Sequence, residues 1–563
     1  MLLPTTRDEM NALNWQDLDV ILISGDTYID SPYNGCALIG RVLLNAGYRV
    51  GIIAQPDPAN PADIARLGEP LLFWGVSAGA VDSMVANTTA LKKPRKRDDF
   101  TPGGINNRRP DRATIAYTNL IRRNFKNTRP IVLGGIEASL RRISHYDYWT
   151  NKIRGSVLLD AKADYLLYGM ADRSILEFAA ALKNQEPVTG IRGLCYIASE
   201  PPSNALVLPS LEEVRAKSSA FIEAFRIFYE NSDSIQGKRL AQKQEARWLI
   251  QNPPAQTLTR EEMDAVYALP FTRQHHPFYE AQGKAPAMET IRFSVVTHRG
   301  CYGECNFCAI TVHEGRTVQW RSEKSILAEI EALTKFPDFK GIIHDLSGPT
   351  ANMYGFECRK KLQSGACKNK RCLFPQSCSQ LTIDHSPHLS LLSKARKIPG
   401  VKKIFIGSGI RYDMILHDPG AGQGYLREVV DHHVSGQLKV APEHDSPKVL
   451  NLMGKPSKDS LLRFKKDFDR MSAAAGKKQF LSYYFIAAHP GCTIKDMKGL
   501  RRFVGKELHL LPEQTQIFTP TPSTWSSVMY ATETDPFSGE HIFVEKDPVR
   551  KQKQKDTLTE KNV

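Results

Sequence analysis

The stretch IRFSVVTHRGCYGECNFC, residues 291–308, decides how the second half of this chain is interpreted. A short apolar run rich in β-branched residues leads directly into a loop that carries Cys301, Cys305 and Cys308. Two glycines in the loop allow a tight turn around bound sulfur. Three thiols at this spacing can be brought to one metal centre at little cost in chain entropy.

The number of cysteines distinguishes between kinds of metal site. A structural zinc site normally has four closed protein ligands. Three protein ligands leave one position open, and an open position indicates chemistry on a bound molecule. His313 is available as a fourth ligand, but in a loop rich in Gly and Thr it reads as an ordinary polar residue. The loop therefore favours a reactive centre over a structural one.

The CxxxCxxC spacing, with Phe307 before the last cysteine, resembles the signature of radical SAM enzymes. This resemblance implies that Cys301, Cys305 and Cys308 hold a 4Fe–4S cluster whose remaining iron binds S-adenosylmethionine (SAM). It also implies an external electron donor of the reduced flavodoxin or ferredoxin type, and cleavage of SAM to methionine and a 5′-deoxyadenosyl radical. The implied fold is a full or partial β/α barrel with the cluster loop after its first strand.

The residues around this loop independently predict such a barrel over 286–535. About six apolar runs alternate there with helical stretches such as SEKSILAEIEALTKF. The runs are TIRFSVVTH, KGIIHDLSG, VKKIFIGSG, GQLKVAP, QFLSYYFIAAH and QTQIFTP.

Four of these runs end in stretches that resemble the SAM-binding positions of the superfamily, at the strand ends where barrel active sites lie. The first stretch has no glutamate, so backbone carbonyls would have to contact the amino group of SAM. No residue is assigned a catalytic role. The predicted cofactor-binding residues are Ser347, Gly348, Pro349, Thr350, Ser408, Arg411, Asp413, Glu443 and His489.

A second cysteine group, within an insertion at 355–380, predicts a second metal site. Its four thiols lie among basic residues with little to build a core, so a metal would be needed to hold the insertion together. Structural zinc and an auxiliary iron–sulfur cluster both fit four thiolates. The four are Cys358, Cys367, Cys372 and Cys378; the isolated Cys36, Cys195 and Cys492 are expected to be small buried residues.

The first 200 residues predict a separate doubly wound α/β domain. Five short apolar runs, at 19–25, 49–54, 71–79, 129–139 and 163–172, each end in small residues, and helix-like segments lie between several of them. Ligands of such sheets bind beyond the carboxyl ends of the strands. The region is similar to the flavodoxin-like, cobalamin-binding domain that precedes many radical SAM barrels.

The usual cobalamin signature of that domain, DxHxxG, is not met. In DSPYNG, residues 30–35, Pro32 stands where the histidine would be. A base-on cobalamin and a domain that kept the fold but lost the ligand both remain open. We prefer the second and expect no cobalamin.

Two further segments complete the predicted layout. Residues 201–285 combine a helical pattern with a polar, proline-bearing stretch and are interpreted as a helical linker. Residues 536–563 are polar and charged, and we expect a disordered tail.

Charge and hydropathy limit the partners. Lys and Arg number 75 against 60 Asp and Glu, a net charge of +15, and such an excess can mark a nucleic-acid partner. The basic run at 91–112 could bind phosphate or RNA, but its Asp and Pro residues favour a solvated loop. We expect no membrane span and no signal peptide, and hence a cytoplasmic protein.

Five stretches together resemble the YgiQ-type radical SAM family over residues 5–550. We therefore expect a radical SAM enzyme with an unidentified substrate, and RNA modification is one candidate because of the charge, the basic run and a likeness to methylthiotransferase barrels. The alternative is a non-catalytic iron–sulfur electron carrier or metal-dependent binding protein. The stretches are GGIEASLRRISHYDYW, SGPTANMYGFEC, GSGIRYD, LKVAPEH and FTPTPSTWSSVMYATETDPF.

Overall fold

The structure is a computed structural model that describes residues 1–510, 512 and 514–559. The chain divides into two compact units. Unit 1 comprises Met1–Leu258 and Ala265–Arg292, and unit 2 comprises Thr259–Asp264 and Phe293–Val563. Each unit has its own hydrophobic core, because a single core stops growing beyond roughly 250–300 residues.

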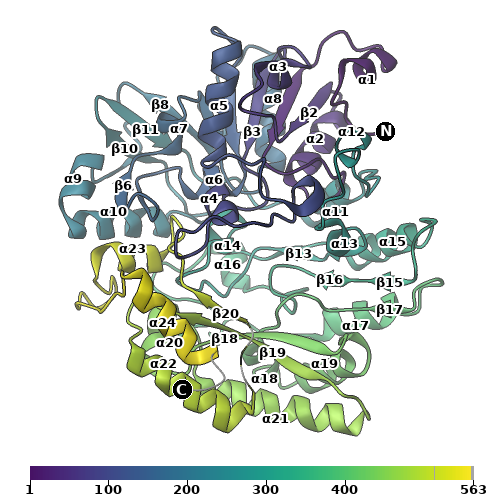
Figure 1. Cartoon of the computed structure of the whole chain (residues 1–563), viewed down its shortest axis with the longest axis vertical. Coiled ribbons are helices and arrows are strands. Elements are labelled where there is room, and N and C mark those ends of the chain that lie inside the picture. Colours follow the sequence, from purple (N-terminus) through teal and green to yellow (C-terminus); the bar gives the residue numbers. More distant parts are fainter. Residues whose placement is uncertain (511, 513, 560–563) are drawn as a thin grey trace. The chain divides into compact units, whose positions relative to one another are not determined.

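Unit 1 is built around a nine-stranded sheet in the order β2-β1-β3-β4-β7-β8-β11-β10-β9. Figure 1 labels β2, β3, β8, β10 and β11 of this sheet. The first five strands are parallel. All five residues of β1 are buried, as a parallel sheet covered on both faces requires. These strands are β1 (Val20–Ser24), β2 (Val50–Ala54), β3 (Phe73–Ser77), β4 (Ile131–Gly134) and β7 (Tyr165–Leu167). Each lies within one of the five predicted runs, and the predicted doubly wound sheet is confirmed.

The region predicted to be a helical linker, 201–285, instead completes this sheet. It supplies β9 (Leu206–Leu208), β10 (Leu240–Gln244) and β11 (Arg247–Gln251), and β11 pairs with β8 (Leu194–Ala198). The polar composition concealed the strands, because three glutamines of β10 and β11 are buried. Their amides bind neighbouring segments: Gln242 Oε1 and Gln244 Oε1 accept from the backbone N–H groups of Ser144 and Ser156, and Gln251 Oε1 accepts from Arg142.

The first three helices of this region are α9 (Leu211–Ala216), α10 (Ser218–Glu230) and α11 (Arg260–Tyr267). After α11 the chain returns to the start of unit 1. A β-bridge joins His275 to Ile29, and the Asp30 N–H donates to the carbonyl of Gln274 at 3.0 Å. In α12 (Pro277–Glu280), the Tyr279 hydroxyl accepts from Ala54 N–H at 2.7 Å. We call residues 272–280 the return segment.

Unit 2 contains a parallel β/α arrangement with six strand positions in chain order (Figure 1). A parallel bridge between Ile410 and Val440 joins the third position to the fourth. The strands are β12 (Ser294–Val296), β15 and β16 (Ile342–Ile343, Asp345–Ser347), β17 (Lys403–Ile404), β18 (Gln437–Glu443), β19 (Phe480–Ala487) and β20 (Gln514–Ile517). All six predicted runs contain a strand, and the predicted partial barrel is confirmed.

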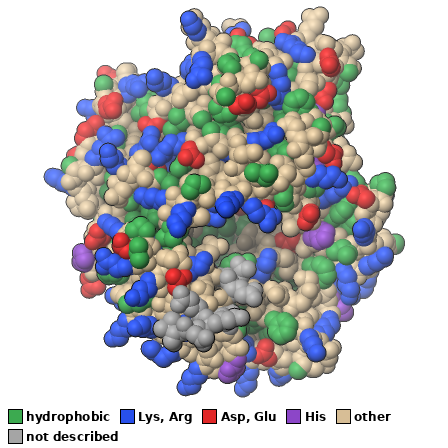
Figure 2. All heavy atoms as spheres, viewed as in Figure 1, with side chains coloured by type: hydrophobic (Ala, Val, Ile, Leu, Met, Phe, Trp, Pro, Cys, Tyr) green, Lys and Arg blue, Asp and Glu red, His purple; other side chains and the backbone are tan. Residues whose placement is uncertain are grey.

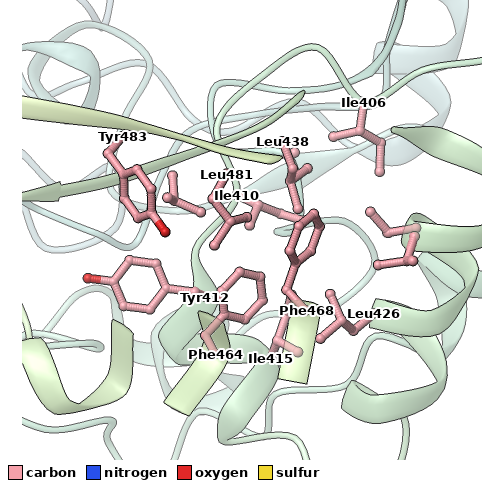
Figure 3. Close-up of a cluster of buried hydrophobic side chains, with 14 of the residues drawn as sticks. Ile406, Ile410, Tyr412, Ile415, Leu426, Leu438, Phe464, Phe468, Leu481 and Tyr483 are labelled. Carbon is pink, nitrogen blue, oxygen red and sulfur yellow. The ribbon is translucent and has the colours of Figure 1, made fainter. Parts of the chain in front are cut away.

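The core of unit 2 packs helices against the barrel strands. Figure 3 shows Phe464 and Phe468, one turn apart on α21 (Lys458–Ala474), in one cluster with Leu438 and Leu481 from β18 and β19. Tyr412, in α18 (Tyr412–Leu416), lies 5.9 Å from Phe464 between ring centroids. This packing fixes the loops at the carboxyl ends of the strands.

The prediction of a disordered tail is wrong for its described part. Residues Pro548–Thr559 form α24, which packs against α22 (Ile494–Phe503) and β20. Polar side chains attach it: Gln554 Oε1 accepts from Ala488 N–H at 3.0 Å, and Lys551 Nζ donates to the Tyr530 hydroxyl at 2.7 Å. Composition could not show these buried polar contacts. The last part of the predicted tail, 560–563, lies outside the described residues.

No helix among the described residues combines the length and the apolar character that a bilayer crossing requires.

Candidate functional site

The three cysteines lie on the loop between β13 (His298–Arg299) and β14 (Gln319–Trp320), directly after β12. The loop begins at Gly300, whose φ is +84°. A Cβ there would lie 2.4 Å from the Thr317 carbonyl oxygen, so the turn requires glycine.

Gly303 places two of the sulfurs close together. Its N–H donates to Cys301 Sγ at 3.3 Å. A Cβ on Gly303 would lie 3.1 Å from Cys301 Sγ and 3.7 Å from Cys305 Sγ, so both sulfurs flank the same glycine. The loop then turns back through a bond from Cys308 N–H to the Cys305 carbonyl, at 3.0 Å.

The electrostatics of the loop show that the three thiols form one group. Burial raises the pKa of the Cys301 and Cys308 thiols, and the neighbouring Cys305 adds to both shifts. Three close thiols disfavour one another as thiolates unless positive charge is present. Bound metal supplies such charge and deprotonates coordinating thiols.

Arg411 contributes positive charge from the chain itself. Its Nη1 donates to Cys305 Sγ at 3.8 Å, and its Nε and Nη2 bind the carboxylate of Asp413 at 2.8 and 2.6 Å. Both side chains are buried. The predicted residues Arg411 and Asp413 are therefore next to the cysteine loop.

The predicted stretch Ser347–Thr350 also borders the loop. The Thr350 hydroxyl lies 3.5 Å from Cys301 Sγ, and the Thr350 carbonyl accepts from His298 Nε2 at 3.0 Å. A Cβ on Gly348 would lie 2.6 Å from His298 Nε2. Ser347 is buried at the end of β16, and Pro349 lies half-buried in the same turn.

Glu443 lies on the same side of unit 2. It has a φ of +68° at an irregularity in the β18–β19 register, where its side chain is buried beside Lys455 at 3.8 Å. Burial raises the pKa of Glu443, and the Lys455 and Arg411 charges oppose this. The Glu443 carboxylate also adds to the raised pKa of Cys308.

Two predicted residues have partners of their own. The Ser408 hydroxyl donates to Asp345 Oδ2 at 2.6 Å. His489 is fully buried, and Nδ1 donates to the Pro490 carbonyl while Nε2 accepts from the Ser526 hydroxyl at 2.7 Å. Burial lowers the pKa of His489 to about 3, so the imidazole is neutral. Its ring lies 6.3 Å from that of Phe307 in the cysteine loop.

A buried network around Asn352, which was not among the predicted residues, joins two of these stretches. Asn352 Oδ1 accepts from Arg411 N–H at 2.8 Å, and Asn352 Nδ2 donates to the Arg411 carbonyl and to His385 Nε2, each at 3.0 Å. His385 Nδ1 in turn donates to Asp418 Oδ2 at 2.7 Å. Asn352 thereby holds the 411 loop against the 347–352 stretch. The only sequence signal for Asn352 was its position at the end of the predicted SAM-binding stretch, in "TAN" at 350–352.

The residues at the triad fit an iron–sulfur cluster. Three thiols, a buried guanidinium and backbone N–H groups meet at one loop, which is the donor set such clusters use. No three His, Cys, Asp or Glu side chains in the described part of the chain converge as ligands of a single metal ion. A cluster offers each thiolate its own iron, so its ligands need not converge on one point.

The second cysteine group lies in an insertion that has more internal support than expected. A buried ion pair joins Glu357 to Lys361 at 3.1 Å. Arg316 of the cysteine loop, which pairs with Glu304 at 2.9 Å, donates to the Cys367 carbonyl of the insertion at 3.0 Å. Leu373, Leu381 and Cys358 belong to a small apolar cluster there.

The thiols of this group are only partly brought together. Burial raises the pKa of Cys372 to about 12, and Lys361 opposes the shift. Cys378 N–H donates to the Cys372 carbonyl at 2.8 Å. The second metal site at Cys358, Cys367, Cys372 and Cys378 stays a prediction. Of the isolated cysteines, Cys195 and Cys492 are buried as expected, whereas Cys36 is only half-buried.

In unit 1 the residues present do not fit a histidine-ligated cobalamin. Asp30, at the start of DSPYNG, binds Arg41 Nε at 2.9 Å and the Thr272 N–H at 2.7 Å. The strand order reverses between β1 and β3, where ligands of such sheets bind. The chain's own segment 98–109 bonds there: the Phe100 carbonyl accepts from Thr27 N–H, and Arg109 Nε donates to the Gly25 carbonyl at 3.0 Å.

Comparison with known proteins identifies relatives along the whole chain. A family model described as "Radical SAM N-terminal" matches residues 2–294. The UPF0313 protein of Fusobacterium nucleatum is 57% identical over 560 residues, covering 99% of each chain. The UPF0313 protein of Thermotoga neapolitana is 48% identical over 563 residues, covering 99% of this chain and 98% of its own.

A solved structure shares the fold at low sequence identity. The radical S-adenosylmethionine methyltransferase TsrM from Kitasatospora setae, solved with cobalamin and a [4Fe-4S] cluster, is 13% identical with a TM-score of 0.51. The match covers 92% of this chain and 78% of that protein. Because TsrM binds cobalamin, it gives no support to our expectation that this chain lacks cobalamin, and the expectation stays untested.

Proposed function

Because this chain belongs to the UPF0313 family and carries a radical SAM N-terminal region, it is a radical SAM protein, and we propose that Cys301, Cys305 and Cys308 hold the 4Fe–4S cluster with which it cleaves SAM. The observation that supports this most strongly is the cysteine loop itself, in which two sulfurs flank Gly303 and Arg411 reaches Cys305. A bound, reduced cluster of this kind supplies the electron that cleaves SAM to methionine and a 5′-deoxyadenosyl radical.

The residues around the loop would hold SAM beside the cluster. We propose that the backbone of Ser347–Thr350 contacts its amino group, since Thr350 lies against Cys301 and no acidic side chain occupies the stretch. The Arg411–Asp413 pair and Glu443 are charged groups beside the triad and are proposed to bind the polar ends of SAM. Ser408 and His489 already have partners, and we propose that they position strand ends.

The proposed substrate class is RNA, which would make the chain an RNA-modifying enzyme that an external flavodoxin- or ferredoxin-type donor reduces. The net charge of +15 supports this choice. A non-catalytic iron–sulfur electron carrier is the alternative. Two polar residues at the triad, Arg411 beside Cys305 and Thr350 beside Cys301, support SAM binding over that alternative.

The test is anaerobic reconstitution of the full chain with iron and sulfide. We expect a reducible cluster seen by electron paramagnetic resonance, and release of 5′-deoxyadenosine from SAM. Cys301→Ala should abolish both, because two thiolates cannot replace three. Cys195→Ala, which removes a buried thiol of unit 1, is the matched control and should retain both.

Two results would reject the proposal. One is a cluster that survives Cys301→Ala unchanged. The other is a normal cluster in the parent chain that neither binds nor cleaves SAM, which would favour the electron carrier.

A further inference from the structure

A loop of unit 1 carries the most concentrated positive charge of the chain on a fixed backbone. Residues 88–106, which we call the basic arm, are held by β-bridges between Thr88 and Pro94 and between Arg97 and Ile105. Arg95 N–H donates to the Asn87 carbonyl at 2.7 Å, and the carbonyl of Lys96 accepts from Asn106 N–H at 3.1 Å. The arm is therefore an ordered structure and not a free loop.

The fold buries one of the two acidic residues that follow the basic run and leaves the basic residues exposed. Asp98 turns inward, where its carboxylate lies 3.1 Å from Arg109 Nη2 and accepts from the Thr101 hydroxyl at 2.7 Å. Asp99 is exposed at the end of the run. Residues 92–97 are all exposed, and five of the six are cations: Lys92, Lys93, Arg95, Lys96 and Arg97.

In the described part of the chain, none of these five cations forms an ion pair. Like charges that a fixed backbone holds close together repel one another and destabilise the folded chain. The expectation of a solvated loop rested on acids that neutralise the run. Because the buried Asp98 pairs with Arg109 instead, it does not neutralise the five cations, which remain available to an anionic partner.

The arm is attached to a neighbouring hairpin formed by β5 (His145–Asp147) and β6 (Lys152–Arg154). Lys92 Nζ donates to the Trp149 carbonyl at 3.3 Å and lies 4.9 Å from the centre of the Tyr148 ring. The Trp149 indole donates to the Thr88 hydroxyl at 2.6 Å. The arm and the hairpin tip thus form one surface.

A hollow of about 840 Å³ continues this surface from Thr150 onward. Lys152, Arg154 and Arg215 line it, and Asp160, its one acid, is bound by Arg154 at 2.7 Å. Its size is in the range of pockets that take small organic groups. Figure 2 shows Lys and Arg side chains spread over the viewed face of the molecule, so total charge alone does not locate a binding site.

We propose that the basic arm and this hollow form a docking surface for the phosphodiester backbone of a nucleic acid. The five exposed cations follow one another along the chain. Such a series suits a chain of phosphates better than one small anion, which needs convergent donors. The inference rests on the proposed function only for the choice of RNA as the natural source of that backbone. Nothing in it requires the cluster.

The experiment measures binding of a fluorescent 20-nucleotide single-stranded RNA to the full chain, with the cluster reconstituted, from low to high KCl. In the variant Lys93→Gln/Arg95→Gln/Lys96→Gln/Arg97→Gln, the slope of log affinity against log salt should become shallower by about 3, because each phosphate that a cation no longer neutralises removes about 0.7 from the slope. The affinity at moderate salt should fall roughly tenfold or more.

The matched control removes four other exposed lysines, Lys335, Lys340, Lys402 and Lys403, which lie before or at the start of barrel strands in unit 2. An equal loss in both variants, or an unchanged slope in the arm variant, would overturn the proposal, since either means that the charge acts diffusely. Competition by poly-glutamate as effective as unlabelled RNA would overturn it in favour of an acidic protein.

Two further measurements distinguish RNA from DNA as the bound nucleic acid, and the docking proposal from the proposed function. A DNA 20-mer is tested beside the RNA: tighter RNA binding supports RNA as the source, and equal binding supports the shared phosphodiester chemistry alone. SAM cleavage by the parent chain is assayed without nucleic acid. If that cleavage fails while arm-dependent binding remains, the proposed function is lost and the docking surface stands.

Discussion

His489 is a buried neutral imidazole, and its burial makes the stability of the chain depend on pH. Its pKa is lowered to about 3 in the folded chain, whereas an unfolded histidine has a pKa near 6.5. Between these values the unfolded chain binds the extra proton. The stabilisation is therefore complete above pH 6.5 and is lost as the pH falls toward 3.

We expect His489→Gln to flatten this dependence. Between pH 7 and pH 5 the parent chain should lose about 2 kcal/mol of unfolding free energy that the variant does not lose. Urea unfolding at the two pH values measures the difference. His417→Gln, at an exposed position, is the control. Equal losses in the parent and in His489→Gln would show that residue 489 does not carry the effect.

At the level of single residues, the sequence was sufficient where the residues of a site lie close together in the chain. The triad could be found because its three cysteines lie within eight positions, and the radical SAM family to which it pointed is confirmed by the family model over residues 2–294. The YgiQ-type family, predicted from five other stretches, is confirmed by the UPF0313 relatives. Asn352 could not be found in this way. Its partners, Arg411 and His385, lie 59 and 33 residues away, and only the packing of three loops brings them together.

At the level of elements, apolar strands were predicted well and polar ones were missed. The runs of β1 and β2 could be predicted because both faces of each strand are buried and need apolar residues. The runs of β18 and β19 could be predicted because one face of each strand is buried, so that apolar residues alternate with others. In β10 the buried positions hold Gln242 and Gln244, whose amides bind other segments. A pattern of hydropathy cannot distinguish such a strand from a linker. Helix α24 was missed for the same reason, because its buried contacts include the polar side chains of Lys551 and Gln554.

Helix α24 should contribute measurably to the stability of unit 2. Leu558 is fully buried in the unit 2 core. We expect Leu558→Ala to lower the unfolding free energy by roughly 2–4 kcal/mol, the usual cost of such a cavity. Lys553→Ala, on the exposed side of the same helix, is the control and should change it by less than about 0.5 kcal/mol. If Leu558→Ala is neutral in urea unfolding, α24 does not stabilise the core.

The whole molecule has two separate cores, so we expect its unfolding to deviate from a two-state transition. In the variant Trp320→Phe/Trp525→Phe, all remaining tryptophans belong to unit 1, and their fluorescence follows unit 1 alone. The visible absorbance of the reconstituted cluster follows unit 2. We expect different urea midpoints for the two signals. Coincident curves at every urea concentration would show that the cores unfold as one.

The return segment sets a delay during synthesis. In the folded protein, backbone bonds join residues 28–30 to partners in residues 272–276, which are synthesised about 245 positions later. At roughly 5–20 residues per second, the ribosome needs on the order of 10–50 seconds to supply them. Throughout that interval residues 28–30 of the nascent chain lack the backbone partners that they have in the folded protein. The earliest part of this protein to be made is thus among the last to be completed, and it is the stage at which a chaperone would have most to protect.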